Sequence, residues 1–177
     1  MESRAKALGH AIHPMLIPFP LGLLATAVVF DVIYLVTDRP GFALTSAYAM
    51  AAGIIGGLVA APFGWADWFT IPADTRAKRV GLLHGVSNVV VIVLFAISWA
   101  LRATAGGGTP TAWAPNSWAL VCSFAAVALA TVAGWLGGEL VERLAVGVAE
   151  GANIDAPNSL SRRRRGAPLP AIGPTGN

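Results

Sequence analysis

Residues 80–101 read VGLLHGVSNVVVIVLFAISWAL, a run without a single charged side chain. Its only strongly polar groups are His84 and Asn88. A helix that crosses the hydrocarbon core of a bilayer needs about 20 predominantly apolar residues. The stretch has that length, and it therefore predicts a membrane-spanning helix.

Three further stretches have the same character, at about residues 15–36, 42–65 and 117–138. Only the first of them contains a charged residue, Asp31. Lipid cannot bond to backbone polar groups, so a spanning segment is a helix or part of a closed barrel, and runs without in-and-out alternation exclude the barrel. Charged residues make up 12% of the chain, against about 25% in a typical soluble domain. The sequence therefore predicts an all-α integral membrane protein.

The connections between the four spans are short, at about residues 37–41, 66–79 and 103–116. Short connections make successive helices antiparallel neighbours, which predicts a four-helix bundle over residues 1–150. Residues 151–177 are rich in Pro, Gly and Arg with little to bury, and we expect a disordered tail there.

The basic residues are distributed unequally between the two sides of this bundle. Four spans place both termini and the second connection on one side, which then holds ten of the 12 Lys and Arg: Arg4, Lys6, Arg76, Lys78, Arg79, Arg143 and Arg162 to Arg165. The other side holds Arg39 and Arg102. The positive-inside rule predicts that both termini are cytoplasmic, and the Ala-, Gly- and Arg-rich composition suits a bacterial inner membrane. The arginine run in the tail favours an anionic lipid surface, and we expect no nucleic-acid partner.

Small residues predict where the helices meet. They lie three or four apart on the second span, at Gly53, Gly57, Ala60, Ala61 and Gly64, and again on the fourth, at Gly134 and Gly138. Such faces let helix backbones approach closely in lipid. The single cysteine, Cys122, lies in an apolar run and is expected to be a small packed residue.

Polar side chains from all four spans gather near the predicted cytoplasmic end. They are His10 and His13 before the first span, Asp67 after the second, His84 and Asn88 in the third, and Glu139 after the fourth. Spans one and three are diagonal in a simple four-helix ring, so His13 and His84 are expected to face each other. Two imidazoles from separate helices can hold haem iron from both sides.

Each histidine also has an ordinary structural interpretation. His10 suits the membrane interface, and the ring of His13 suits a hydrogen bond to backbone at the start of a helix. His84 suits a structural hydrogen bond to the first or second span, although a histidine inside an uncharged span is often functional. The chain lacks a Cys-x-x-Cys-His motif, so any haem would be non-covalent haem b. Asn88, Asp67 and Glu139 would then neighbour the ligands or the haem propionates.

Asp31 is the other ionisable group within a span. It lies five helical turns after His13, hence on the same interior face but about 27 Å away along the axis. Three roles remain open: accepting a hydrogen bond from another helix, pairing with Arg102, or serving an ion or proton path.

Three segments together resemble one family of bacterial membrane proteins, labelled domain of unknown function 2231. The first reads GHAIHPMLIPFPLG from Gly9 to Gly22 and is followed by Asp31; the second has Leu83 and His84 with Asn88; the third reads GWLGGELV from Gly134 to Val141. The resemblance covers about residues 8–149 and implies the membrane bundle. Some members of that family carry a Rieske-type iron–sulfur domain, which implies a redox setting. Where members often have a histidine after Gly-Gly-Glu-Leu-Val, this chain reads Glu142 to Val148 without one.

Three functional hypotheses follow. The first is a haem b electron carrier with His13 and His84 as axial ligands and a redox protein as partner. The second is an accessory subunit of a larger membrane complex, or a homo-oligomer. The third is a small transporter or proton conductor that uses Asp31, Asp67 and the histidines. The sequence contains no motif of a soluble enzyme, and it leaves open whether the protein has an enzymatic role.

Overall fold

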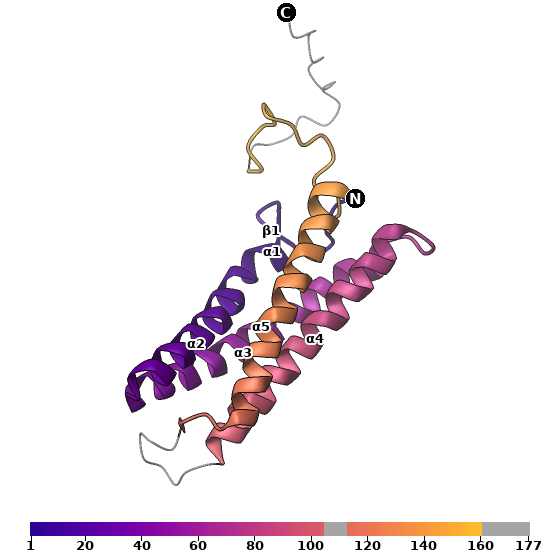
Figure 1. Ribbon diagram of the computed structural model, residues 1–177. Helices are drawn as coiled ribbons and strands as arrows, with labels where there is room; N and C mark the ends of the chain where they lie inside the picture. Colours follow the sequence, from indigo (N-terminus) through magenta and orange to yellow (C-terminus); the bar gives the residue numbers. More distant parts are fainter. Residues whose placement is uncertain (105–112, 161–177) are drawn as a thin grey trace, which may run out of the picture.

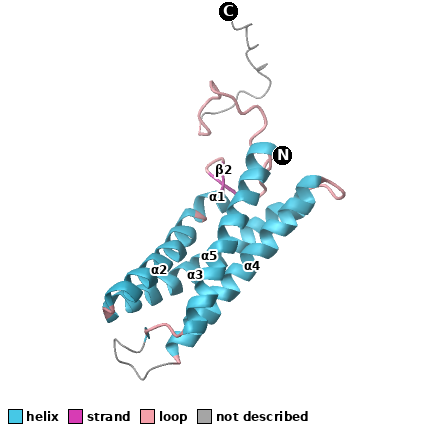
Figure 2. Ribbon diagram, viewed as in Figure 1, coloured by secondary structure: helices cyan, strands magenta, loops and turns pink. Residues whose placement is uncertain are grey.

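The computed structural model describes residues 1–104 and 113–160, and it is a bundle of long helices (Figure 1, Figure 2). Its elements are the strands β1 (Lys6–Ala7) and β2 (His10–Ala11), the helices α1 (Ile12–Leu16), α2 (Pro18–Thr37), α3 (Pro40–Thr70), α4 (Arg76–Ala103) and α5 (Ser117–Gly138), and the π-helical turn η2 (Glu139–Arg143). Within the described residues, four helical segments are long and apolar enough to cross a membrane. The predicted fold class is therefore confirmed.

At two places the helices extend beyond the predicted spans. The first helical segment begins at Ile12, ahead of the predicted start at about residue 15, and it divides into α1 and α2 because Pro18 and Pro20 have no amide hydrogen for the helical ladder. The second span continues to Thr70, so the connection to α4 is far shorter than the predicted 66–79. Helix α4 then starts behind Thr75, whose side chain accepts a hydrogen bond from the backbone N–H of Lys78.

The helices pack as two hairpins. Helix α2 packs most extensively on α3, and α4 on α5; α3 contacts α4 to join the hairpins, while α2 contacts α5 less extensively. This order of neighbours places α2 diagonally opposite α4. The described N- and C-terminal segments lie at the same end of the bundle (Figure 1). Residue 1 and residues 145–150 are linked there, since Gly147 N–H donates to the Met1 carbonyl.

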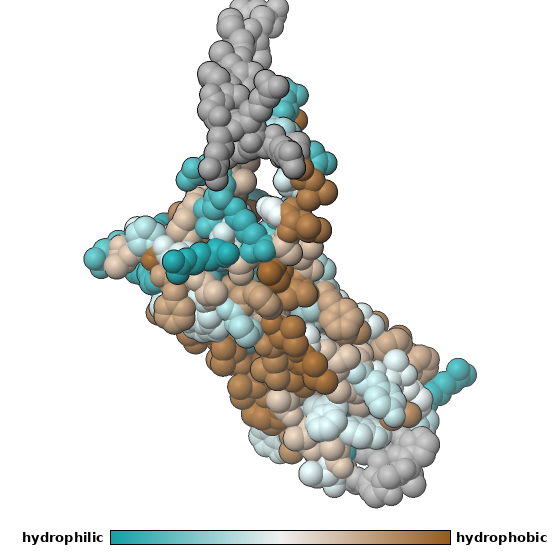
Figure 3. All heavy atoms as spheres, turned by 180° about the vertical axis from the view of Figure 1, so that it is seen from behind, coloured by the Kyte–Doolittle hydropathy of each residue, from teal (hydrophilic) through white to brown (hydrophobic). Residues whose placement is uncertain are grey.

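The core of the bundle is narrow, and most large apolar side chains point outward. The buried cluster consists of Leu24, Ala27, Val28, Met50, Val91, Phe95 and Ala126. Figure 3 shows apolar side chains covering the middle of the bundle, with hydrophilic side chains gathered at the end that carries the termini. An apolar belt of this kind suits lipid as the surrounding solvent.

The small-residue faces were only partly as predicted. Gly53 lies against Leu24, and Gly57 lies against Ile92. At Gly134 and Gly138, however, nothing lies within 4 Å of where a Cβ would be. These two glycines face outward, so the predicted close helix packing at Gly134 and Gly138 was wrong.

The segment before α1 forms a small hairpin. Strands β1 and β2 pair antiparallel through a two-residue turn at Leu8 and Gly9, which both have positive φ angles of 51° and 86°. Two successive positive φ angles match the type I′ turn, whose twist suits a hairpin. Residues 151–160 form turns and are exposed. The rest of the predicted disordered tail, with Arg162 to Arg165, and most of the third connection lie outside the described residues.

Candidate functional site

His13 is half-buried and is fixed by the neighbouring helix of its own hairpin. Its Nδ1 atom lies 3.0 Å from the backbone carbonyl oxygen of Ala60 in α3. The ring lies flat against Gly64, one turn further along, where an added Cβ would come within 2.8 Å of the His13 Cε1 atom. The glycine therefore provides the space in which the imidazole reaches the carbonyl.

His84 has the same arrangement in the second hairpin. Its Nδ1 atom lies 2.8 Å from the carbonyl oxygen of Ala133 in α5, and its ring lies over Gly137, where a Cβ would be 3.1 Å from Cε1. The interpretation of His84 as a structural hydrogen-bonding residue correctly predicted a hydrogen bond to another helix. Its partner was wrong, because the acceptor belongs to the fourth span rather than the first or second.

These two hydrogen bonds decide which nitrogen of each ring is available. A carbonyl oxygen can only accept, so each Nδ1 carries a hydrogen and donates it. In a neutral imidazole of this tautomer, the lone pair is on Nε2. A histidine that binds a metal has this arrangement, with its other N–H donated to a carbonyl that fixes the orientation of the ring. Both histidines are thus held in a form suited to coordination.

Asn88 covers the free nitrogen of His84. Its side-chain Nδ2 lies 3.3 Å from the Nε2 of His84 and donates to the His84 carbonyl oxygen at 2.9 Å. The predicted alignment of the two side chains on one face of α4 is confirmed. A ligand that bound His84 through Nε2 would require the Asn88 amide to turn aside.

The two histidines belong to the same end of the bundle. His13 is in the span formed by α1 and α2, and His84 is in α4, which lies diagonally opposite α2. Each ring is hydrogen-bonded within its own hairpin, and among the described residues no hydrogen bond joins the two rings.

Asp67 and Glu139 lie nearer the end of the bundle than the histidines and have other partners. Asp67 is seven residues beyond Ala60, about 10 Å along the helix axis, and accepts hydrogen bonds from Ser3 Oγ at 2.7 Å and from the Arg4 backbone N–H at 2.9 Å. Glu139 forms an ion pair with Arg76 at 2.7 Å. These contacts fasten the N-terminal segment to α3 and the start of α4 to η2.

His10 is separate from this pair. It is exposed on β2, and its Nε2 atom lies 3.2 Å from Ser159 Oγ. It therefore offers a natural control for experiments on the other two histidines.

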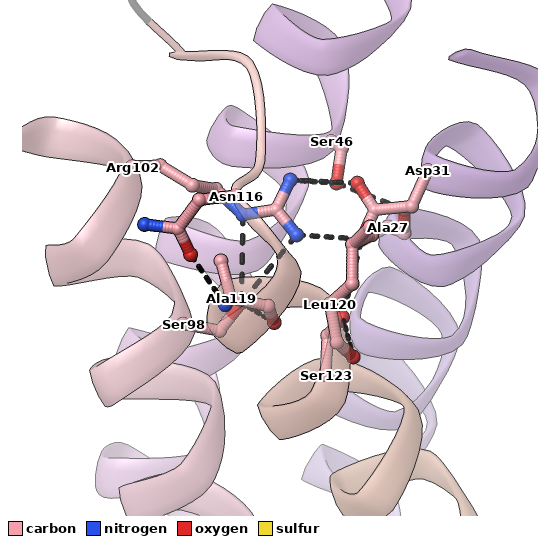
Figure 4. Close-up of polar contacts among 9 residues, drawn as sticks. All are labelled: Ala27, Asp31, Ser46, Ser98, Arg102, Asn116, Ala119, Leu120 and Ser123. Carbon is pink, nitrogen blue, oxygen red and sulfur yellow. Dashed lines mark hydrogen bonds and ion pairs between the residues drawn. The ribbon is translucent and has the colours of Figure 1, made fainter. Parts of the chain in front are cut away.

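Asp31 and Arg102 form a closed polar cluster at the opposite end of the bundle. The guanidinium donates to both carboxylate oxygens, with N–O distances of 2.6 Å, and both side chains are completely buried. Figure 4 shows the two side chains pointing toward each other between the helices. Three hydroxyls complete the cluster: Ser46, Ser98 and Ser123. Of the three roles left open for Asp31, the structure therefore has the pairing with Arg102.

This cluster satisfies itself without solvent. Within the described part of the chain, every buried side-chain nitrogen and oxygen has a hydrogen-bond partner. A buried ion pair is stabilising only when its remaining hydrogen-bonding groups are satisfied, and here they are. The arrangement links α2 to α4, with serines from α3 and α5, and thus ties all four spans together.

Four residues of the histidine site were not predicted to belong to it, although two of them, Ala60 and Gly64, were assigned to a helix-packing face. Ala60 and Ala133 act through their backbone carbonyls, and Gly64 and Gly137 act through the absence of a side chain. The available signal was an Ala and a Gly four residues apart in both the second and the fourth span. That pattern is so common in membrane helices that it indicates packing before it indicates a site.

The comparisons with known proteins concern the whole bundle. The family described as "predicted membrane protein (DUF2231)" matches residues 9–150. The chain belongs to this family. The DUF2231 match includes α1 to α5 and both histidines of the site, which confirms the resemblance seen in the sequence. No curated protein and no solved structure matches the chain.

Proposed function

We propose that this DUF2231 protein is a non-covalent haem b protein that carries electrons in the bacterial inner membrane, with His13 and His84 as the axial ligands of the iron. One observation carries the proposal. Each Nδ1 donates to a backbone carbonyl, at 3.0 Å for His13 and 2.8 Å for His84, which leaves the lone pair on Nε2. Two separately oriented imidazoles from diagonal spans are what a six-coordinate haem requires.

The number of ligands favours haem over a bare metal ion. Within residues 1–104 and 113–160, no group of three or more His, Cys, Asp and Glu side chains is arranged to hold an ion. Structural and catalytic zinc sites use at least three protein ligands. In haem the porphyrin supplies four nitrogens, so two histidines are sufficient. When bound, haem iron supplies a one-electron carrier.

The residues around the rings have defined tasks in this proposal. The carbonyls of Ala60 and Ala133 hold the imidazole planes, and Gly64 and Gly137 allow the rings to lie against the helices. The Asn88 amide covers His84 Nε2 and would have to turn aside for a ligand to bind there. Asp67 and Glu139 stabilise the end of the bundle, because the carboxylate of Asp67 accepts a hydrogen bond from Ser3 and that of Glu139 forms an ion pair with Arg76.

We also propose that the end carrying both termini and the histidines faces the cytoplasm. Arg102 is completely buried against Asp31, so it is not a free positive charge at the opposite end. Only Arg39 then remains on that side among the Lys and Arg of the sequence, and even without the four tail arginines six lie on the other side. The positive-inside rule favours the cytoplasm for the more basic side.

The transport hypothesis receives less support from the contacts of Asp31. A proton or ion path needs a carboxylate that can exchange its partners with the transported species. The Asp31 carboxylate is fully buried, bound by Arg102 on both oxygens, and also accepts a hydrogen bond from Ser123. We therefore do not assign it to a path.

Visible absorption spectroscopy tests the haem proposal. Protein expressed with added haem and purified in detergent should show a Soret band and sharp bands after reduction with dithionite. The His13→Ala and His84→Ala variants should lose the six-coordinate spectrum, whereas His10→Ala should retain it because His10 is exposed outside the bundle. The Asn88→Ala variant should bind haem at least as well as the wild type, since it uncovers Nε2.

A colourless wild-type protein under these conditions would overturn the proposal. A spectrum unchanged in both the His13→Ala and the His84→Ala variant would overturn the assignment of the ligands. In the first case the accessory-subunit hypothesis becomes the leading one, and co-purification of a native membrane complex is the next measurement.

A further inference from the structure

The two hairpins of the bundle carry matching features at matching positions. His84 lies 71 residues after His13, and Arg102 lies 71 residues after Asp31. The acceptor carbonyl of Ala133 lies 73 residues after that of Ala60, and each is followed four residues later by the glycine under the ring. One shift thus relates α2 to α4, and a nearly equal one relates α3 to α5.

The buried positions follow the same two shifts. Four buried residues of α2 have a buried residue of α4 71 positions later in the chain. The pairs are Pro20 and Val91, Leu24 and Phe95, Ala27 and Ser98, and Asp31 and Arg102. Four buried residues of α3 have a buried residue of α5 73 positions later in the chain. These pairs are Ser46 and Ala119, Met50 and Ser123, Gly53 and Ala126, and Ala60 and Ala133. Any two helices with one buried face share such a period. The further agreement is that His13 and His84, and also Asp31 and Arg102, are separated by the same 71 residues as the buried positions of these helices.

Hydrogen bonds inside the two hairpins provide an independent correspondence. Ser46 Oγ in α3 donates to the Ala27 carbonyl in α2 at 2.9 Å. Under the two shifts these residues correspond to Ala119 and Ser98, and Ser98 Oγ in α4 donates to the Ala119 carbonyl in α5 at 2.7 Å. In both hairpins, a hydrogen bond therefore connects the same two positions. The hydroxyl is on the second helix of the first hairpin, α3, and on the first helix of the second hairpin, α4.

We propose that the bundle is two copies of one helical hairpin related by a pseudo-twofold axis along the membrane normal. This axis pairs His13 with His84 in one ligand site, and it pairs Asp31 with Arg102 in one buried ion pair. Both hairpins run from the histidine end to the ion-pair end and back, so they have the same orientation in the membrane. Parallel repeats of this kind are an established construction in membrane proteins.

The axis explains why Asp31 meets Arg102, and it makes the positions of His13 and His84 equivalent. A residue close to a twofold axis faces its own equivalent in the other copy. Identical acids or bases at that position would repel each other, whereas Asp31 and Arg102 attract, which makes the joint between the halves specific to one pairing. At the other end, each half holds its own histidine through its own carbonyl.

The symmetry also describes the class of ligand, a step that rests on the proposed function. A site between two equivalent imidazoles suits a flat ligand whose two faces are bound alike, as in a metalloporphyrin. Both histidines then contribute equally. The repeat itself does not depend on haem, and it is tested separately.

An exchange of the polar residues of the Asp31–Arg102 cluster between the two hairpins tests the repeat. The full exchange variant carries Asp31→Arg, Arg102→Asp, Ala27→Ser, Ser98→Ala, Ser46→Ala, Ala119→Ser, Met50→Ser and Ser123→Met. Each polar group then occupies its equivalent position in the other hairpin. The matched control exchanges the charges alone, as Asp31→Arg with Arg102→Asp, and leaves the hydroxyls where they are.

Pseudo-symmetry predicts that the full exchange restores the contacts that the control lacks. The acid at position 102 would regain a hydroxyl donor at position 50, and the arginine at position 31 would regain hydroxyls at positions 27 and 119. The thermal unfolding midpoint of the full exchange in detergent should lie above that of the control and within about 5 °C of the wild type. A full exchange that is no more stable than the control would overturn the proposed axis.

Titration with haemin tests the ligand site. In an Asn88→Ala background, which removes the amide that covers His84 alone, the His13→Ala and His84→Ala variants should show equal losses of haemin affinity, within about threefold. A large loss at one histidine with none at the other would contradict the shared site while leaving haem binding itself intact. If haemin does not bind the wild type at all, the proposed function and this ligand step fail, and the exchange experiment still decides the repeat.

Discussion

Arg102 lies one residue from the C-terminal end of α4, yet its guanidinium is completely buried and binds both carboxylate oxygens of Asp31, 71 residues earlier in the chain. Arginine is suited to this contact because its planar fork matches the two oxygens of a carboxylate. The contact joins diagonal helices, and it therefore holds the two hairpins in one mutual register.

Loss of one partner of this pair should destabilise the bundle strongly. The Asp31→Asn variant leaves the Arg102 charge buried without a counter-charge, which typically costs about 3–5 kcal/mol. Replacing both partners by apolar residues, as Asp31→Leu with Arg102→Met, removes the uncompensated charge and should recover most of the lost stability. Unfolding midpoints in detergent measure both variants. A single variant as stable as the wild type would show that the pair contributes nothing to the bundle.

Much of this fold was predictable because the bilayer restricts the choices. Lengths of apolar sequence fixed the number of spans, and the short connections fixed their antiparallel order, both of which the structure confirms. The extension of α3 to Thr70 was not predicted, although residues 65–71 contain no Gly or Pro, because the aromatic residues there are equally typical of an interfacial connection. The hairpin at residues 6–11 depends on the positive φ of Leu8, which composition does not reveal.

The candidate site was predictable only in its polar members. His13, His84 and Asn88 stand out because polar groups in an apolar span are rare, and Asp31 stands out for the same reason. The alanine carbonyls that hold the rings have no signature in the sequence, because every residue has a carbonyl. The internal repeat is hidden because its key positions differ chemically, with Asp31 matching Arg102 and Ala27 matching Ser98. Equivalent positions are visible only once burial and hydrogen bonds are known.

The glycine beneath His13 should be intolerant of a side chain. In the Gly64→Ala variant, the new Cβ would come within 2.8 Å of His13 Cε1 and 3.0 Å of Nδ1, so the ring must leave the Ala60 carbonyl or the helices must separate. Overpacking of this kind typically costs about 1–3 kcal/mol. Gly134→Ala is the matched control, because nothing lies within 4 Å of its Cβ position. Equal unfolding midpoints for the two variants would contradict the described position of the His13 ring.

Asp67 should control the order of the N-terminal segment rather than the stability of the bundle. Its carboxylate accepts hydrogen bonds from Ser3 and from the Arg4 backbone. The Asp67→Ala variant should therefore increase hydrogen–deuterium exchange at residues 3–12 while α4 and α5 keep their protection. The variant Asp74→Ala, in the connection before α4, serves as a control. Unchanged exchange in the N-terminal segment would mean that the other contacts of that segment are sufficient to hold it.

The burial of Arg102 also sharpens the expected orientation of the protein in the membrane. With Arg102 neutralised by Asp31 inside the bundle, Arg39 alone supplies a free positive charge among the Lys and Arg of the sequence on the side opposite the termini. A green fluorescent protein fused after residue 177 should therefore fluoresce, since it folds in the cytoplasm, whereas alkaline phosphatase fused at the same point should be inactive.

Cysteine labelling provides a second measurement of this orientation that needs no fusion. In a Cys122→Ser background, a cysteine introduced at residue 38, in the connection between α2 and α3, should react with a membrane-impermeant thiol reagent in intact spheroplasts. A cysteine introduced at residue 74, in the connection between α3 and α4, should react only after lysis. The reverse pattern would contradict the positive-inside assignment and would place the histidine end of the bundle on the outer side of the membrane.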